Sequence, residues 1–179
     1  MSNGTNTENI NKIVISDTTA ITYLAKIKAL YLLKSLFKII YIPEAVYDEL
    51  TRQGDHIPGS KEVKTLPWIK VEKVRDIEKF ASKFKIPLHE GELQAICLAL
   101  QKNADLLIMD ERDGRQEATN QGLRITGMLG IFLKAKENNL IPAVRPFMDK
   151  LRLTNFKLKP ELYTAVLKKA GELEQSNSA

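Results

Sequence analysis

Short runs of β-branched and apolar residues alternate along this chain with longer stretches of helical periodicity. Four runs are typical of buried strands and a fifth predicts a short edge strand: KIVIS (12–16), KIIYI (38–42), ADLLIM (104–109), LRIT (123–126) and, at the edge, WIKVEKV (68–74). Strands that alternate with helices form parallel sheets that are covered by helices on both faces. The alternation therefore predicts a three-layer α/β/α fold with a central parallel sheet of four to five strands.

Helical patterns fill most of the segments between these runs. We expect one or two helices within 19–36 and single helices at 43–52, 75–85, 89–102 and 128–138. The stretch GDHIPGSKEV (54–63) has the glycine and proline content of a loop. These patterns predict one domain over residues 12–140.

The two ends of the chain differ from this domain. Residues 1–11 are polar and predict a disordered leader, without the basic start and apolar middle of a signal peptide. Residues 141–173 predict two further helices, which form a C-terminal extension packed on the domain.

Composition narrows the setting in which the chain works. No apolar run approaches the roughly 18 residues of a membrane-spanning helix, so we expect no membrane partner. The single cysteine, Cys97, lies in the apolar stretch AICLAL and cannot pair within the chain, which favours the cytoplasm. The net charge of +5 mildly favours an anionic partner such as nucleic acid.

Several chemistries lack the residues that they need. Two histidines and one cysteine cannot form a Cys/His zinc site of the usual kind. The glycine-rich phosphate loops and the G-x-S-x-G serine motif are absent from the sequence. A phosphatase with Asp17 as the nucleophile is a minor alternative, because haloacid-dehalogenase-type enzymes carry a second aspartate where this chain has Thr19.

Carboxylates follow two of the predicted strands directly. Asp17 comes after IVIS, and Asp110 comes after ADLLIM. Ligand sites of parallel sheets gather beyond the carboxyl ends of the strands. Simpler interpretations exist, because Asp17 or Ser16 can cap the next helix and Asp113-Gly114 is a turn signal. Glu111 and Asp113 also remain alternatives to Asp110.

Two glutamates lie on the faces of predicted helices that border the core. Glu49 falls about 60° from Val46 on a helical wheel, whereas Asp48 lies on the far side. Glu92 falls within the apolar arc of its helix and Glu90 outside it. A carboxylate placed beside apolar residues is costly unless donors or a cation compensate it. Glu49 and Glu92 therefore join Asp17 and Asp110 as candidate site residues.

Four carboxylates at one sheet edge would repel one another unless a cation neutralised them. Mg²⁺ or Mn²⁺ suits such a cluster, because these ions prefer oxygen ligands. Such ions activate water for attack on phosphodiesters, which is how metal-dependent nucleases work. The residues alone therefore predict a metal site formed by Asp17, Glu49, Glu92 and Asp110.

Four segments in this order resemble the acidic motifs of PIN-domain ribonucleases: IVISDTTA, IPEAVYDEL, HEGELQAICLAL and ADLLIMDERDGR. The resemblance covers residues 12–140. Within the family, the chain most resembles an uncharacterised prokaryotic PIN-like subgroup that is often compared with VapC-type toxins. It implies that Asp17, Glu49, Glu92 and Asp110 are catalytic and bind Mg²⁺ or Mn²⁺. It also implies that Thr18 or Thr19 orients the first acid.

The expected function is a metal-dependent endoribonuclease, the toxin of a type II toxin–antitoxin pair. Its expected partners are RNA, a cognate antitoxin and a second copy of the chain in a homodimer. We expect Thr18, Arg112 and Arg115 to bind substrate, with Arg124 and Lys134 as further candidates for phosphate contact. The alternative is a PIN-like module that binds or assembles with little or no catalysis.

Overall fold

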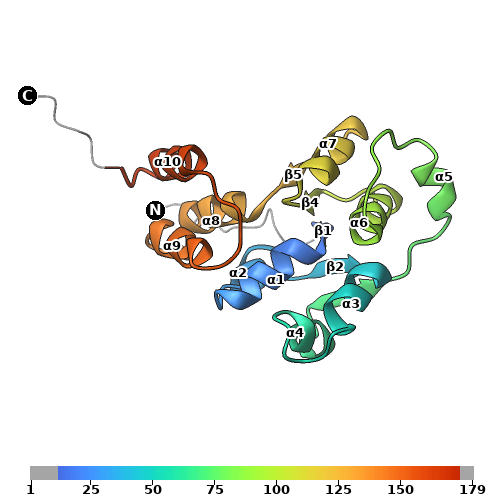
Figure 1. Ribbon diagram of the computed structural model, residues 1–179, viewed down its shortest axis with the longest axis horizontal. Helices are drawn as coiled ribbons and strands as arrows, with labels where there is room; N and C mark the ends of the chain where they lie inside the picture. Colours follow the sequence, from blue (N-terminus) through green and yellow to red (C-terminus); the bar gives the residue numbers. More distant parts are fainter. Residues whose placement is uncertain (1–11, 174–179) are drawn as a thin grey trace, which may run out of the picture.

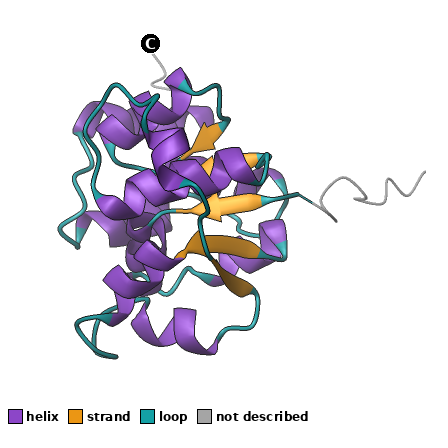
Figure 2. Ribbon diagram, turned by 90° about the vertical axis from the view of Figure 1, so that its right-hand side faces the viewer, coloured by secondary structure: helices purple, strands orange, loops and turns teal. Residues whose placement is uncertain are grey.

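The computed structural model describes residues 12–173, so the leader predicted over 1–11 lies outside the described residues. Five parallel strands form one sheet in the order β3-β2-β1-β4-β5. Their bounds are β1 Val14–Ser16, β2 Ile40–Pro43, β3 Ile69–Glu72, β4 Leu106–Ile108 and β5 Ile125–Thr126. Helices lie on both sides of this single layer (Figures 1 and 2). The predicted α/β/α fold, including the edge strand, is confirmed.

Side chains of each strand alternate between two hydrophobic cores, one on each face of the sheet. Val14, Ile40 and Ile108 belong to the larger core, and Ile15 and Leu107 belong to the smaller one. This alternation follows from the two-residue period of a strand. Because the central strands β1, β2 and β4 are largely buried on both faces, they read in the sequence as continuous apolar runs, whereas the edge strand β3 is exposed at Lys70 and Val71.

Ten helices cover the sheet within residues 12–173. Their bounds are α1 Thr18–Lys26, α2 Tyr31–Phe37, α3 Glu44–Thr51, α4 Ser60–Thr65, α5 Ile77–Ala81, α6 Glu90–Gln101, α7 Arg112–Asn120, α8 Met128–Glu137, α9 Arg145–Arg152 and α10 Pro160–Lys169. None of these helices has the length and apolar character needed to cross a membrane. In Figure 1, α8, α9 and α10 gather at one end of the molecule, and α3, α4, α5 and α6 lie toward the other.

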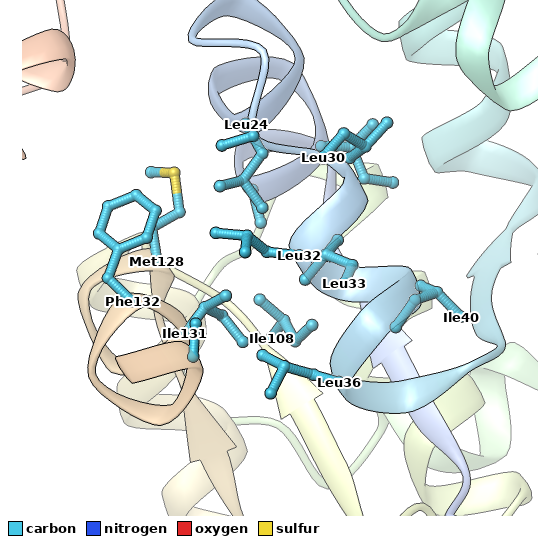
Figure 3. Close-up of a cluster of buried hydrophobic side chains, with 14 of the residues drawn as sticks. Leu24, Leu30, Leu32, Leu33, Leu36, Ile40, Ile108, Met128, Ile131 and Phe132 are labelled. Carbon is cyan, nitrogen blue, oxygen red and sulfur yellow. The ribbon is translucent and has the colours of Figure 1, made fainter. Parts of the chain in front are cut away.

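The larger core joins α1 and α2 to α8 across β4. Figure 3 shows Leu32, Leu33 and Leu36 of α2 facing Met128 and Ile131 of α8. These five side chains are at most 2 % exposed. Full burial of a side chain of this size stabilises a fold by about 1.5–3 kcal/mol. This packing therefore fixes the position of α8 against the sheet.

The smaller core is built mainly from α6, whose buried residues are Ala95, Ile96, Cys97, Leu98 and Ala99. Cys97 is fully buried, as its apolar context predicts. Burial also raises the pKa of its thiol to about 11, so this cysteine packs as a small apolar residue.

Two helices lie where the sequence did not predict them. Ser60–Thr65 forms α4 inside the expected loop, and Arg112–Asn120 forms α7, so Asp113-Gly114 is helical and not a turn. Gly114 permits this helix, because a Cβ there would collide with the Met109 sulfur. The predicted helix at 75–85 is shortened to Ile77–Ala81.

The C-terminal extension consists of α9 and α10, as expected, and a carboxylate ties it down. Glu172 accepts hydrogen bonds from Lys136 Nζ on α8 at 2.9 Å and from the N–H groups of Val144 and Arg145 at 2.6 and 2.9 Å. The carboxylate therefore satisfies free N–H groups at the start of α9. Burial acts to raise the pKa of Glu172, but these hydrogen bonds hold it below its ordinary value.

Glu172→Gln is expected to lower the free energy of unfolding by about 1–2 kcal/mol at pH 7, because it removes a charged acceptor from three donors. A carboxyl with a lowered folded pKa stabilises the fold above its unfolded pKa of 4.5 and loses this effect as the pH falls through the folded value. Urea titrations should therefore show the deficit at pH 7 and its disappearance under acid conditions. Glu137→Gln, at an exposed position on α8, is the matched control. An unchanged midpoint for Glu172→Gln would contradict this role.

Candidate active site

The pairing of β1 with β4 creates a crevice at the carboxyl edge of the sheet. From β1 the chain continues to β2 and β3 on one side, and it returns later to β4 on the other side. Ligands of open parallel sheets bind at such a switch point. Ser16 is in register with Ile108, and the Asp17 N–H donates to the Ile108 carbonyl at 3.1 Å. Asp17 and Asp110 therefore follow the two strands that border the crevice.

Asp17 is buried with one carboxylate oxygen unsatisfied. Its Oδ1 accepts the Ala20 N–H at 3.2 Å and caps α1, so the capping interpretation is confirmed for Asp17, whereas Ser16 donates to a backbone carbonyl. Its Oδ2 has no hydrogen-bond partner in the part of the chain that the structure describes. A buried polar atom without a partner costs about 1–3 kcal/mol. Helix capping thus explains the position of Asp17 Oδ1 and leaves the burial of Oδ2 unexplained.

Burial and neighbouring carboxylates act on the charge of Asp17. Burial raises its pKa most, followed by the repulsion from Asp110, with Glu92 as a smaller contributor, and the result is about 8 although the backbone N–H groups of Ala20 and Asp110 act to lower it. Asp110 and Glu92 therefore lie near enough to Asp17 for their charges to raise its pKa. A cation among them would relieve both the repulsion and the lack of a partner for Oδ2.

Asp110 is held by the start of α8. The Met128 N–H donates to Asp110 Oδ1 at 3.0 Å and to Oδ2 at 3.3 Å. Burial raises the pKa of Asp110 to about 6, although the Met128 N–H and Arg115 act to lower it. A Cβ on Gly127 would lie 2.5 Å from Asp110 Oδ1, so a larger residue at position 127 would displace this carboxylate from its present position.

Glu49 of α3 accepts hydrogen bonds from two donors, one on α1 and one on α6. Thr18 donates its hydroxyl to Glu49 Oε2, and the Gly91 N–H donates to Oε1 at 3.0 Å. Of the two residues expected to orient the first acid, Thr18 or Thr19, Thr18 instead donates its hydroxyl to the second acid, and no hydrogen bond joins the Thr19 hydroxyl to Asp17 among the described residues. A Cβ on Gly91 would lie 2.6 Å from Glu49 Oε1, so this glycine makes room for the carboxylate.

Glu92 lies in the first turn of α6, half-buried, and accepts the His89 N–H at 3.1 Å. Burial raises its pKa, and the charges of Glu111 and Asp113 add to this effect. One surface pocket collects the side chains around it: Thr18, Thr19, Glu49, His89, Glu92 and Glu111. The structure therefore groups Glu92 with Glu49 in this pocket and, through its charge, with Asp17.

The three acids after β4 have different surroundings. Asp110 is beside Asp17, Glu111 lines the pocket of Glu49 and Glu92, and Asp113 is exposed on α7. Asp110 alone among them is held by a backbone donor at the crevice. This geometry favours Asp110 as the fourth acid and leaves Glu111 at the rim of the same site.

The predicted basic residues divide between the two edges of the sheet. Arg112 and Arg115 line a shallow pocket with Asp110, close to the acids. Arg115 also donates Nη1 to the Met109 carbonyl at 2.7 Å, which fixes the end of β4. Arg124 and Lys134 line a pocket with Lys12 and Asp105 at the starts of the strands. These two residues therefore lie at the edge opposite to the acids, because parallel strands place their starts at one common edge, and their contact with phosphate stays a prediction.

The carboxylates are not arranged around a metal ion. Within residues 12–173, no three His, Cys, Asp or Glu side chains form a group that could hold one. Glu49, Glu92 and Asp110 instead each accept hydrogen bonds from the protein, and these bonds direct the carboxylates toward protein donors and not toward a common point. The donor set still suits a hard cation, since all four groups are carboxylates and Asp17 Oδ2 lacks a partner.

Three residues that shape the site were not predicted from the sequence. Gly91 holds Glu49, and Gly127 gives Asp110 access to the Met128 N–H. Glu117 of α7 is fully buried and accepts the N–H groups of Lys85 and Ile86, both at 3.0 Å, which anchors the loop that leads into α6. The glycines at helix starts were the available signal, whereas nothing in the sequence marks Glu117.

Asp17→Asn is expected to stabilise the metal-free protein by about 2 kcal/mol at pH 8, because it removes a buried charge and keeps an oxygen for the cap. A carboxyl with a raised folded pKa binds more protons in the folded state, so wild-type stability falls as the pH rises from the unfolded value of 3.8 to about 8. The gain should therefore shrink toward pH 5. Denaturant titrations in EDTA measure it, with the exposed Asp48→Asn as control. A variant less stable than wild type at pH 8 would refute the burial of this charge.

Comparison with known protein families agrees with this fold. A family model described as a PIN domain matches residues 13–172, which include α9 and α10. No curated protein matches the chain. PIN domains are generally nucleases and typically use divalent metals. Since the match covers nearly the whole chain, the protein belongs to the PIN-domain family.

Proposed function

We propose that this protein is a metal-dependent endoribonuclease and the toxin of a type II toxin–antitoxin pair. The observation that carries the proposal is the unpartnered Oδ2 of Asp17, buried beside Asp110 at the switch point of the sheet. Folding places this charge where it destabilises the protein, and such placements are typical of functional sites. The family supports a nuclease type of fold.

Asp17, Glu49, Glu92 and Asp110 would hold Mg²⁺ or Mn²⁺. When bound, such an ion supplies an activated water and neutralises charge on the attacked phosphodiester. Asp17 Oδ2 has no hydrogen bond to give up among the described residues, although it is buried, so neighbouring side chains would have to move to admit the ion. Glu49 and Asp110 would each give up or share a hydrogen bond from the protein, so the Thr18 hydroxyl and the Gly91 and Met128 N–H groups govern where these carboxylates rest.

The chain's own residues would position the RNA. Arg112 is exposed beside Asp110 and forms no ion pair among the described residues, so it is available for a phosphate. Arg115 is a positioning residue, because its hydrogen bond to the Met109 carbonyl holds the segment that carries Asp110. The net charge of +5 supports association with an RNA strand. A homodimer, a cognate antitoxin and a cytoplasmic location are part of the same proposal.

One observation favours a second candidate, a PIN module that binds RNA or a protein without cleaving it. All four carboxylates accept at least one hydrogen bond from the protein, and the described residues hold no ready group of metal ligands. A module of this kind would need no metal. Binding measured by calorimetry would then be unaffected by Mn²⁺ and by the change of Asp17 to asparagine.

The nuclease proposal predicts that purified protein cleaves single-stranded RNA with Mn²⁺ or Mg²⁺ and not in EDTA. Asp110→Asn should lower the cleavage rate by about 100-fold, as loss of a group that stabilises charge in the transition state does. Asp113→Asn, three residues away on the exposed side of α7, is the matched control and should keep most of the activity. Equal losses in the two variants would overturn Asp110 as the fourth acid.

Two further results would decide the function itself. Expression of the wild-type chain should arrest growth, and Asp17→Asn should relieve the arrest. If neither metal supports cleavage of any RNA tested, while RNA binding persists in EDTA, the binding module replaces the nuclease.

A further inference from the structure

A second pocket lies at the edge of the sheet opposite to the acidic residues. The starts of β1, β4 and β5 border it together with the end of α2 and one side of α8. Its lining includes Lys12, Phe37, Leu106, Arg124, Ile131 and Lys134, and its volume is about 180 Å³. Neither the predicted active site nor any step of the proposed nuclease reaction uses this pocket.

The charged groups in this pocket are mostly positive. Lys12 precedes β1, Arg124 precedes β5 and Lys134 lies on α8, and none of them forms an ion pair within residues 12–173. The one carboxylate in the lining, Asp105, accepts the Ile13 N–H at 2.7 Å through Oδ2. That interaction commits one of its oxygens to holding β1 beside β4. The three cations thus leave the pocket with an excess of positive charge.

The remaining walls are apolar, with one hydroxyl. Phe37 and Ile131 are 3 % and 1 % exposed and form a rigid floor. The Thr126 hydroxyl lies beside Gly130 on α8, where a Cβ would collide with it. Glycine at position 130 therefore lets α8 approach β5 and keeps this hydroxyl in the lining. Cations around an apolar floor suit a ligand with an anionic group attached to a ring.

The volume limits how much of a ligand can enter. At about 180 Å³ the pocket is close to a cavity that holds one benzene ring, about 150 Å³, and below the range of about 300–1,000 Å³ for drug-sized ligands. It can accept one phosphate with its sugar, or a phosphate beside part of a base. Guanidinium and ammonium groups together are the usual partners of phosphate.

We propose that this pocket binds the phosphate group of a nucleotide, either a free nucleoside monophosphate or one residue of a nucleic acid strand. The three cations would hold the phosphate oxygens, and Phe37 and Ile131 would contact the sugar or base. This inference goes beyond the proposed function and does not depend on it, because the pocket contains none of Asp17, Glu49, Glu92 and Asp110.

The test uses the full chain in EDTA, so that metal at the acidic edge cannot hold a phosphate. Inorganic phosphate, AMP, malonate and a deoxytetranucleotide with internal phosphodiesters only are titrated while amide NMR shifts and calorimetric heats are recorded. AMP should shift the amides of Leu106, Arg124 and Thr126 and bind more tightly than malonate. Binding of phosphate and AMP alone assigns a free nucleotide, and binding of the tetranucleotide assigns a strand.

Arg124→Gln combined with Lys134→Gln should weaken AMP binding by about tenfold or more, because each substitution removes a charged donor. The matched control is Arg75→Gln combined with Lys79→Gln, which removes the same charge at exposed positions near α5. Lys134→Gln alone, with a loss of about threefold, serves if the double variant does not fold.

Three results would overturn the proposal. They are unshifted amides around the pocket, equal losses in the control variant, and malonate binding as tight as that of AMP. The first two would show that phosphate does not select this pocket, and the third would show that any dianion suffices.

Discussion

The parallel pairing of β1 with β4 is the constraint on which the rest of the site depends. Its register sets Ser16 beside Ile108, and this brings Asp17 and Asp110 to the crevice where the chain changes direction across the sheet. The buried core that surrounds both strands then leaves these carboxylates little water. Burial raises the pKa of each, repulsion from Asp110 adds to the effect on Asp17 and repulsion from Glu111 to that on Asp110, and one oxygen of Asp17 stays without a partner. The buried carboxylates thus destabilise the fold locally, at the crevice between β1 and β4 where a ligand could bind.

Backbone donors at helix starts hold the other carboxylates of the site. Gly91 gives its N–H to Glu49, and Met128 gives its N–H to Asp110, in both cases at the beginning of a helix where such groups lack intrahelical acceptors. A glycine faces each of these carboxylates. A Cβ on Gly91 would collide with Glu49, and a Cβ on Gly127 would collide with Asp110. These contacts keep the acids ordered in the absence of a cation. They also explain why the acids do not surround a common point.

Much of the fold could be predicted because buried parallel strands carry their signal locally, as apolar runs such as IVIS and DLLIM. The acids at the ends of these runs followed from the same pattern. Helix α7 was missed because Asp113-Gly114 favours a turn, and the close contact with Met109 that requires Gly114 is a tertiary one. The Thr18–Glu49 hydrogen bond joins residues 31 positions apart, so no local pattern could indicate it. Arg124 and Lys134 lie at the edge opposite to the acids, and the sequence could not indicate this because charge alone does not reveal where a side chain lies on the sheet.

The proposed metal site is tested most directly by a crystal structure of the protein soaked in Mn²⁺, with the ion located by its anomalous signal. We expect one peak in the crevice, about 2.0–2.4 Å from Asp17 Oδ2 and within reach of Asp110 and Glu92 after small side-chain rotations. Glu49 should turn from the Gly91 N–H toward the ion or toward a water bound to it. A crevice without a peak, with Asp17 Oδ2 still unpartnered at saturating Mn²⁺, would contradict the claim that these carboxylates form a metal site.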